Sequence, residues 1–176
     1  AVIYSNPNNP SWICLKDEEL RTIGDLANKY DVIVLEDLAY FAMDFRKELG
    51  TPFQPPYQST VARYTDNYLL LISGSKAFSY AGQRIGVVVI SDKLYHRVYP
   101  GGTFGSVFIH RALYAISSGV SHSAQYAMAA MMKAASDQDF AFLEEVKEYG
   151  HRAKRLKDIF LRHGFHLVYD TDLGEP

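Results

Sequence analysis

The sequence predicts an α/β fold with a mixed, mostly parallel sheet flanked by helices. Residues 17–30 have the apolar periodicity of a helix and lie between two short apolar runs, which predicts a parallel βαβ unit. Two further apolar runs are too close together for a crossover helix, so the second of them is expected to run antiparallel. The expected strands cover residues 1–4, 32–35, 68–72 and 86–90.

The first helix and the loop before the third strand follow from local patterns. Asp17 is expected to cap a helix that runs to about Tyr30. The apolar face of this helix should contain Leu20, Ile23, Leu26, Ala27 and Tyr30. The proline-rich residues 51–57 predict an irregular loop.

Beyond the fourth strand the sequence becomes helical. A glycine-rich loop at residues 101–105 precedes expected helices at 106–118 and 121–135. Residues 139–163 have the pattern of a long amphipathic helix. Its apolar side should contain Phe142, Val146, Tyr149, Ala153, Leu156 and Phe160. A new strand is expected to start within residues 166–169.

Polar clusters accompany the ends of the first three expected strands. Residues 5–11 are rich in asparagine and proline, residues 37–40 carry an aspartate and a tyrosine, and residues 73–84 carry serines, a lysine and an arginine. The carboxyl ends of parallel strands meet at one edge of an open α/β sheet, where such folds bind ligands. The three clusters are therefore expected to converge on one ligand.

The third cluster indicates the chemistry of that ligand. Ser73, Ser75 and Arg84 offer hydroxyls and a guanidinium, which suit a phosphate. Lys76 lies among them in the sequence and can act as an amine nucleophile toward a carbonyl. Together these side chains predict a phosphate-bearing aldehyde that is held covalently.

The three clusters resemble the motifs of the class I/II aminotransferases, the fold-type I enzymes that use pyridoxal 5'-phosphate (PLP). The family's Asn-Pro-x-Asn-Pro-[Thr/Ser]-Gly element is similar to residues 6–12, and its Asp-x-x-Tyr element is similar to residues 37–40. Its Ser-x-Ser-Lys-x-Phe…Gly-x-Arg-x-Gly element is similar to residues 73–86. The resemblance implies a fold-type I large domain, in which a mostly parallel sheet contains one reversed strand.

The resemblance also implies a role for each residue. Lys76 would form a Schiff base with PLP and move a proton at the substrate's α-carbon. Asp37 would pair with the pyridine nitrogen of the ring. Asn9 and Tyr40 would hydrogen-bond its phenolic oxygen. The phosphate would be held by Ser73, Ser75 and Arg84.

Domain organisation and reaction are implied in the same way. Residues 1–150 would form the PLP-binding part of the large domain, and residues 151–176 the start of a small C-terminal domain. The chain would then be the central piece of a longer, homodimeric enzyme that transfers an amino group between an amino acid and a 2-oxo acid. Trp12 departs from the family's glycine and predicts a different local turn or a shifted loop.

Three alternatives remain open. A β-lyase or synthase of the same fold would use the same Lys76 and Asp37, and would differ in which bond breaks at the substrate's α- or β-carbon. A PLP-sensing domain of a transcription regulator would bind the cofactor without sustained catalysis. A nucleotide-binding α/β domain is the third, but no Gly-x-Gly-x-x-Gly follows the first expected strand.

Composition narrows the classes of partner. The formal net charge of -2 gives no electrostatic argument for binding nucleic acid or an anionic membrane. The single cysteine, Cys14, excludes an internal disulfide, which fits a reducing compartment such as the cytoplasm. The histidines do not cluster with acids or cysteines in a pattern that predicts a metal site.

Overall fold

A computed structural model describes residues 1–168 of the chain. Its centre is a four-stranded sheet with the order β1-β2-β3-β4. The strands are Val2–Ser5, Val34–Leu38, Tyr68–Ser73 and Gly86–Ile90. β1, β2 and β3 are parallel and β4 runs antiparallel to β3, as the short connection between them predicts. The predicted α/β fold with a mixed, mostly parallel sheet is confirmed.

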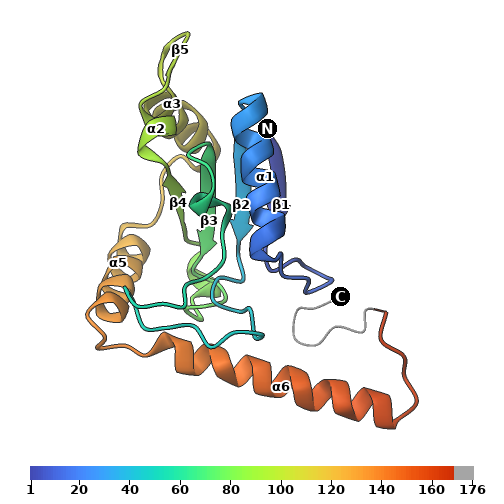
Figure 1. Cartoon of the computed structure of the whole chain (residues 1–176). Helices are drawn as coiled ribbons and strands as arrows, with labels where there is room; N and C mark the ends of the chain where they lie inside the picture. Colours follow the sequence, from blue (N-terminus) through green and yellow to red (C-terminus); the bar gives the residue numbers. More distant parts are fainter. Residues whose placement is uncertain (169–176) are drawn as a thin grey trace.

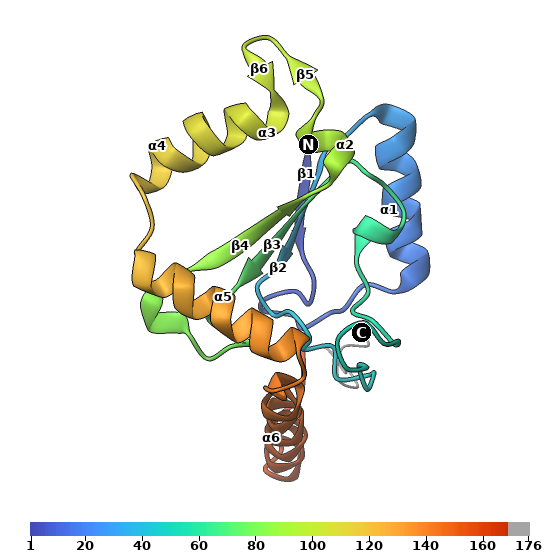
Figure 2. The same cartoon turned by 90° about the vertical axis from the view of Figure 1, so that its left-hand side faces the viewer.

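Helices lie on both sides of this sheet. In Figure 2, α1 lies on one side, and α3 and α4 lie on the other. α5 and α6 lie toward the carboxyl ends of the parallel strands, and α6 runs across that end of the molecule (Figure 1). The bounds of these helices are Asp17–Tyr30 (α1), Phe104–Val107 (α3), Tyr114–Ser117 (α4), His122–Ser136 (α5) and Phe142–Arg162 (α6).

The apolar core has two parts. Under α1, a small cluster of buried side chains comprises Leu20, Ala27, Val34 and Val61. A larger cluster lies among the loops after β2 and β3 and helices α5 and α6. Its buried members are Ala42, Met43, Ala77, Phe78, Met128, Ala135, Phe142 and Val146. Since Ala42 and Ala77 belong to those loops, apolar burial anchors the segments that carry the second and third polar clusters.

The start and the buried face of α1 differ from the prediction. Lys16, and not Asp17, is the N-cap, and its amide donates a hydrogen bond of 2.8 Å to the Glu19 carboxylate. Leu26 and Tyr30 are exposed, so the buried face is narrower than the apolar periodicity indicates. That face consists of Leu20, Gly24 and Ala27.

The second strand also differs from the predicted range of 32–35. Its parallel ladder with β3 continues as far as Leu38, which lies opposite Ile72. β2 therefore covers Val34–Leu38. As a result, Asp37 lies inside the strand, one residue before its end, and not in the loop that follows it.

The glycine-rich segment after β4 is a short hairpin and not only a loop. Strands β5 (Val98–Tyr99) and β6 (Gly102–Thr103) pair antiparallel. The helical region that follows begins at Phe104, two residues before the predicted start. A π-helical segment, η3 (Phe108–Leu113), joins α3 to α4. A further short helix, α2 (Asp92–Tyr95), precedes the hairpin.

Helix α6 buries only part of its predicted apolar side. Its buried positions are Phe142, Val146 and Gly150, whereas the exposed ones include Tyr149, Leu156 and Phe160. The helix continues through Gly150 without a break, and the division of the chain at residue 150 stays a prediction. Residues 166–168 do not form a strand, and Tyr169 lies outside the described residues. No helix within residues 1–168 is long and apolar enough to cross a membrane.

Candidate active site

A cavity of about 370 Å³ lies at the carboxyl ends of β2 and β3. Its wall contains the predicted site residues Asp37, Ser73, Ser75 and Arg84. The sheet register explains this grouping, because Asp37 is close to the end of β2 and Ser73 ends β3 opposite Gly86. A Cβ atom on Gly86 would lie 2.8 Å from the Ile72 carbonyl oxygen, so this close approach of β4 to β3 requires glycine.

The remaining predicted residues form a second group beside the cavity. The Asn9 amide nitrogen Nδ2 donates a hydrogen bond to the Tyr40 hydroxyl oxygen over 3.1 Å. The Lys76 amine Nζ lies 5.7 Å from the centroid of the Tyr40 ring. Lys76 is exposed and does not line the cavity, although Ser75, the residue before it, does. The two groups are thus adjacent along the loop after β3.

The cavity wall offers donors suited to an anion. The Ser73 hydroxyl oxygen accepts a hydrogen bond of 3.1 Å from the Ser75 amide, so its proton can be donated to a ligand. Arg84 is exposed and has a φ of 51°, in the left-handed region. One of its terminal nitrogens, Nη1, donates to the Ala81 carbonyl oxygen over 2.8 Å. The other guanidinium N–H groups suit a phosphate.

Asp37 contributes an acceptor to the same cavity. Its Oδ1 atom accepts a hydrogen bond of 3.0 Å from the Ala39 amide. Within residues 1–168, no hydrogen bond to its other oxygen is found. The half-buried carboxylate can therefore accept a hydrogen bond from a protonated nitrogen of a ligand in the cavity.

Trp12 packs next to this group. It has a φ of 60°, a conformation that glycine adopts readily, so the loop accommodates tryptophan without leaving a glycine-like backbone. Its ring stacks on Phe45 with centroids 5.7 Å apart. It also meets the Tyr40 ring edge-on at 5.1 Å. Trp12 thus contacts Tyr40, whose hydroxyl oxygen accepts the hydrogen bond from Asn9.

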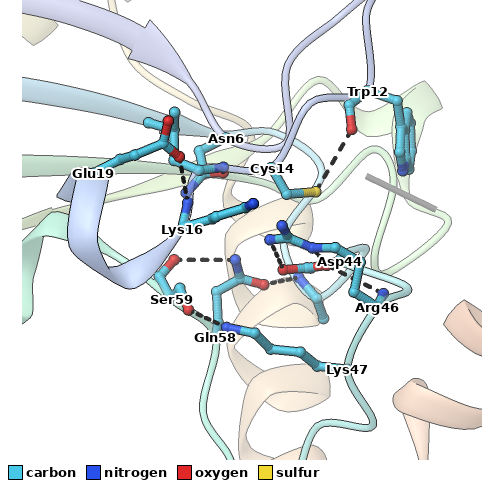
Figure 3. Close-up of polar contacts among 12 residues, drawn as sticks. Asn6, Trp12, Cys14, Lys16, Glu19, Asp44, Arg46, Lys47, Gln58 and Ser59 are labelled. Atoms are coloured by element: carbon cyan, nitrogen blue, oxygen red, sulfur yellow. Dashed lines mark hydrogen bonds and ion pairs between the residues drawn. The ribbon is translucent and has the colours of Figure 1, made fainter. Parts of the chain in front are cut away.

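Cys14, at the end of the Asn-Pro loop, lies next to Asp44 and Arg46, which follow Tyr40 in the chain (Figure 3). The Arg46 guanidinium contacts the Asp44 carboxylate through hydrogen bonds of 2.8 and 2.7 Å. The Cys14 sulfur donates to the Trp12 carbonyl oxygen over 3.7 Å. Burial, reinforced by the negative charge of Asp44, raises the pKa of the Cys14 thiol to about 12.

Comparison with known proteins identifies the family. The profile described as "Aminotransferase class I and II" matches residues 1–170. The chain belongs to this aminotransferase family. Enzymes of the family depend on PLP.

Relatives of the chain are named aminotransferases. The probable aspartate aminotransferase of Methanocaldococcus jannaschii is 27% identical over 93 residues, which is 53% of this chain and 22% of the relative. The mitochondrial kynurenine/alpha-aminoadipate aminotransferase of Bos taurus is 32% identical over 118 residues, which is 62% of this chain and 26% of the relative. The match thus spans about a quarter of these relatives' length.

Solved structures of proteins named aminotransferases share the fold of this chain. The aspartate aminotransferase of Thermotoga maritima has a TM-score of 0.68 and 18% identity, with 95% of this chain and 38% of that one covered. Bna3p, a putative kynurenine aminotransferase from Saccharomyces cerevisiae, also has a TM-score of 0.68, with 22% identity over 92% of this chain and 34% of that one. At these identities the likeness shows the fold.

The donor set of the cavity fits PLP. Two hydroxyls and a guanidinium can serve its phosphate, and a carboxylate can serve its pyridine nitrogen. The amine for its aldehyde belongs to Lys76, which follows the lining residue Ser75 in the chain. Within residues 1–168, no group of three His, Cys, Asp or Glu side chains could hold a metal ion. The donors of the cavity wall suit the organic cofactor by their own chemistry.

Two other large cavities lie away from the predicted site residues. One, of about 470 Å³, is apolar and is bordered by the proline-rich loop together with Phe41, Phe78 and Phe142. Its wall holds no carboxylate, amine or guanidinium. The other, also about 470 Å³, is polar, but Arg97 in its wall already pairs with Asp31 at 2.9 Å. Neither of these two cavity walls contains any of the predicted site residues.

The sequence motifs gave no role to two buried polar residues near the site, Asn6 and Glu36. They are 1% and 0% exposed, and the Asn6 amide nitrogen donates to a Glu36 carboxylate oxygen over 3.0 Å. The sequence of the strand itself indicated a buried acidic residue. Glu36 precedes Asp37, and adjacent residues of a strand point to opposite faces, so one of the two acids had to face the interior.

Proposed function

We propose that this protein is a PLP-dependent aminotransferase that transfers an amino group between an amino acid and a 2-oxo acid. The observation that carries the proposal is the shared cavity wall, whose residue Ser75 directly precedes Lys76 in the chain. That wall combines Asp37, Ser73, Ser75 and Arg84. The printed names of the relatives agree with this reaction.

The cavity residues are proposed to bind and orient the cofactor. Ser73, Ser75 and Arg84 donate hydrogen bonds to its phosphate, because hydroxyls and a guanidinium fork suit that group. Asp37 accepts a hydrogen bond from the pyridine nitrogen and favours the protonated ring. When bound, PLP supplies an electron sink for charge that develops at the substrate's α-carbon.

The group beside the cavity is proposed to act on the aldehyde end. Lys76 is the point of covalent attachment, and its amine then moves a proton at the substrate's α-carbon. Tyr40 and Asn9 orient the phenolic oxygen of the ring. Since the Asn9 amide donates to the Tyr40 oxygen, the Tyr40 proton points elsewhere and can be donated to a ligand.

The proposal extends to assembly and location. We propose a homodimer in the cytoplasm, with a large domain over residues 1–150 and a small domain beginning at 151. Exposed apolar side chains such as Ile116 and Leu156 offer surface for further contacts. Light scattering on the purified protein measures the mass in solution, and a monomer would contradict the homodimer.

Product analysis tests the reaction. The protein, expressed from its complete reading frame and loaded with PLP, is incubated with pairs of amino acids and 2-oxo acids. We expect a new amino acid to form in the same amount as the donor amino acid disappears, with no turnover by Lys76→Ala. Release of ammonia and pyruvate without a new amino acid would indicate a β-lyase. Binding of PLP without turnover of any pair would instead indicate a PLP sensor.

A further inference from the structure

We propose that Glu36 is a positioning residue whose buried carboxylate holds the Asn9 loop where Asn9 reaches Tyr40. The inference rests on the proposed function, in which Asn9 and Tyr40 orient the phenolic oxygen of PLP. Glu36 does not itself line the cavity. It follows Leu35 and precedes Asp37 on β2, so its side chain points to the other face of the sheet.

The Glu36 carboxylate binds three donors from two distant segments. Its Oε1 atom accepts a hydrogen bond of 3.0 Å from Asn6 Nδ2. Its Oε2 atom accepts one of 2.5 Å from the Thr60 hydroxyl and one of 2.9 Å from the Val61 amide. Hydrogen bonds to a charged acceptor in a water-poor site are short and strong, so this carboxylate links three parts of the chain rigidly.

Asn6 connects the Glu36 carboxylate to the loop that contains Asn9. While its Nδ2 atom donates to Glu36, its Oδ1 atom accepts a hydrogen bond of 3.0 Å from the Leu15 amide. Asn6 and Leu15 stand at the two ends of the loop that contains Asn9. Inside the loop, the Trp12 amide donates to the Asn8 carbonyl oxygen over 2.8 Å. The Asn8 amide also donates to the Ile13 carbonyl oxygen over 2.9 Å. The base of the loop, outside these backbone bonds, is closed by the Asn6 side-chain amide, which Glu36 orients.

The buried phenol of Tyr4 lies near this carboxylate. Its hydroxyl is buried and has no hydrogen-bond partner within residues 1–168. Burial, followed by the negative charge of Glu36, raises the pKa of Tyr4. Glu36 is itself 0% exposed, so its charge acts in a place that water does not screen.

Glu36→Gln is expected to break the contact with Asn6 and to keep those with Thr60 and Val61. A glutamine side chain has one acceptor oxygen, and the two donors on the Thr60 and Val61 side favour keeping it there. Its NH₂ group then faces Asn6 Nδ2, so two donors oppose each other. Asn6 cannot turn its amide over without losing its bond to Leu15. The substitution is expected to release Asn6 with almost no change in volume.

Thr60→Val is the matched control, because it removes one donor to the same carboxylate and leaves the contact between Asn6 and Glu36. Both variants leave a buried polar group short of a partner, so both should lower stability. Asn6→Ala removes the other half of the tested contact. It must reproduce the effect of Glu36→Gln, and it replaces that variant if the glutamine protein does not fold.

Two readouts separate positioning from stability. In Glu36→Gln, PLP binding measured by visible absorbance is expected to weaken about tenfold, the worth of one misplaced hydrogen bond. The pH midpoint of the bound cofactor's absorbance should shift as well, because its phenolic oxygen loses an oriented donor. Without PLP, hydrogen exchange in residues 5–14 should be faster in Glu36→Gln than in the control. Thr60→Val should match the wild type in affinity and midpoint.

The outcomes distinguish this inference from the function on which it rests. If the wild type binds PLP and Glu36→Gln binds it with the same affinity and pH midpoint, the positioning role is overturned and the proposed function stands. If the wild type binds no PLP, the proposed function fails. Hydrogen exchange of residues 5–14 then decides alone whether Glu36 holds the loop.

Discussion

Asn9 and Tyr40 are joined by a hydrogen bond of 3.1 Å from the asparagine amide to the phenol oxygen. This bond links the loop after β1 to the turn after β2. The Tyr40 ring is also met edge-on by Trp12, and the Lys76 amine lies over it at 5.7 Å. Three separate segments thus determine the position of one phenol next to the proposed attachment point of the cofactor.

Tyr40→Phe tests this arrangement. The variant loses the hydroxyl and keeps the ring, so PLP binding should weaken roughly fivefold to tenfold while the free energy of unfolding falls by less than about 1 kcal/mol. Absorbance titration and urea denaturation measure the two quantities. Because Asn9→Ala breaks the same contact, the loss of PLP affinity in the double variant should be smaller than the sum of the two single losses. Fully additive losses would show that the two side chains act independently.

Trp12→Gly tests whether the ring contacts of Trp12 stabilise the folded state by more than its left-handed backbone conformation costs. Glycine removes the cost of a left-handed residue, about 1–2 kcal/mol, but also loses two ring contacts of about 0.5–1.5 kcal/mol each and the buried area of the indole. We expect a net loss of roughly 1 kcal/mol in the free energy of unfolding, and a smaller loss in Trp12→Phe. A glycine variant more stable than the wild type would show that backbone strain outweighs the packing.

The raised pKa of Cys14 predicts how the free energy of unfolding changes at alkaline pH. Burial and Asp44 raise its pKa from 9.0 to about 12, so the folded state prefers the neutral thiol. The stability that this supplies is complete below about pH 9 and is lost as the pH rises toward 12. Urea denaturation at about pH 8 and about pH 10 should show a steeper fall for the wild type than for Cys14→Ala. Parallel falls would contradict the assignment.

The Asp44–Arg46 pair should contribute far more to the free energy of unfolding than exposed ion pairs do. The Asp44 side chain is 3% exposed and that of Arg46 12%. Removing one partner of such a pair costs about 3 kcal/mol, which Asp44→Ala should show in urea denaturation. The control is Lys133→Ala in α5, where the pair with Asp137 is largely exposed and worth less than about 1 kcal/mol. Similar losses in the two variants would contradict the buried role of Asp44.

Strand patterns predicted the sheet well because its topology follows from connection length. The reversal of β4 follows from the lack of room for a helix after Tyr68–Ser73, and the pairing of Ser73 with Gly86 follows in turn. The same register brings Ser73, Ser75, Arg84 and Asp37 to one cavity. Motifs thus located these side chains, although no pattern could say that Lys76 lies outside the cavity wall.

Burial was harder to predict than chain direction. Periodicity placed Leu26 and Tyr30 on the apolar face of α1, but the surface that α1 covers is narrow and both side chains are exposed. Conversely, Glu36 was not recognised, because its partners Thr60 and Val61 come from a loop whose path the sequence does not specify. Long-range partners of a buried charge depend on loop geometry and require the structure.

Reductive labelling of the cofactor-bound lysine tests the central claim most directly. The protein, expressed from its complete reading frame, is incubated with PLP and reduced with borohydride, and the modified residue is mapped by mass spectrometry with Lys76→Ala as control. We predict that the label is found predominantly on Lys76 and is absent from that position's peptide in the variant. A folded protein that carries scattered label, or the same total label with and without Lys76, would contradict the account.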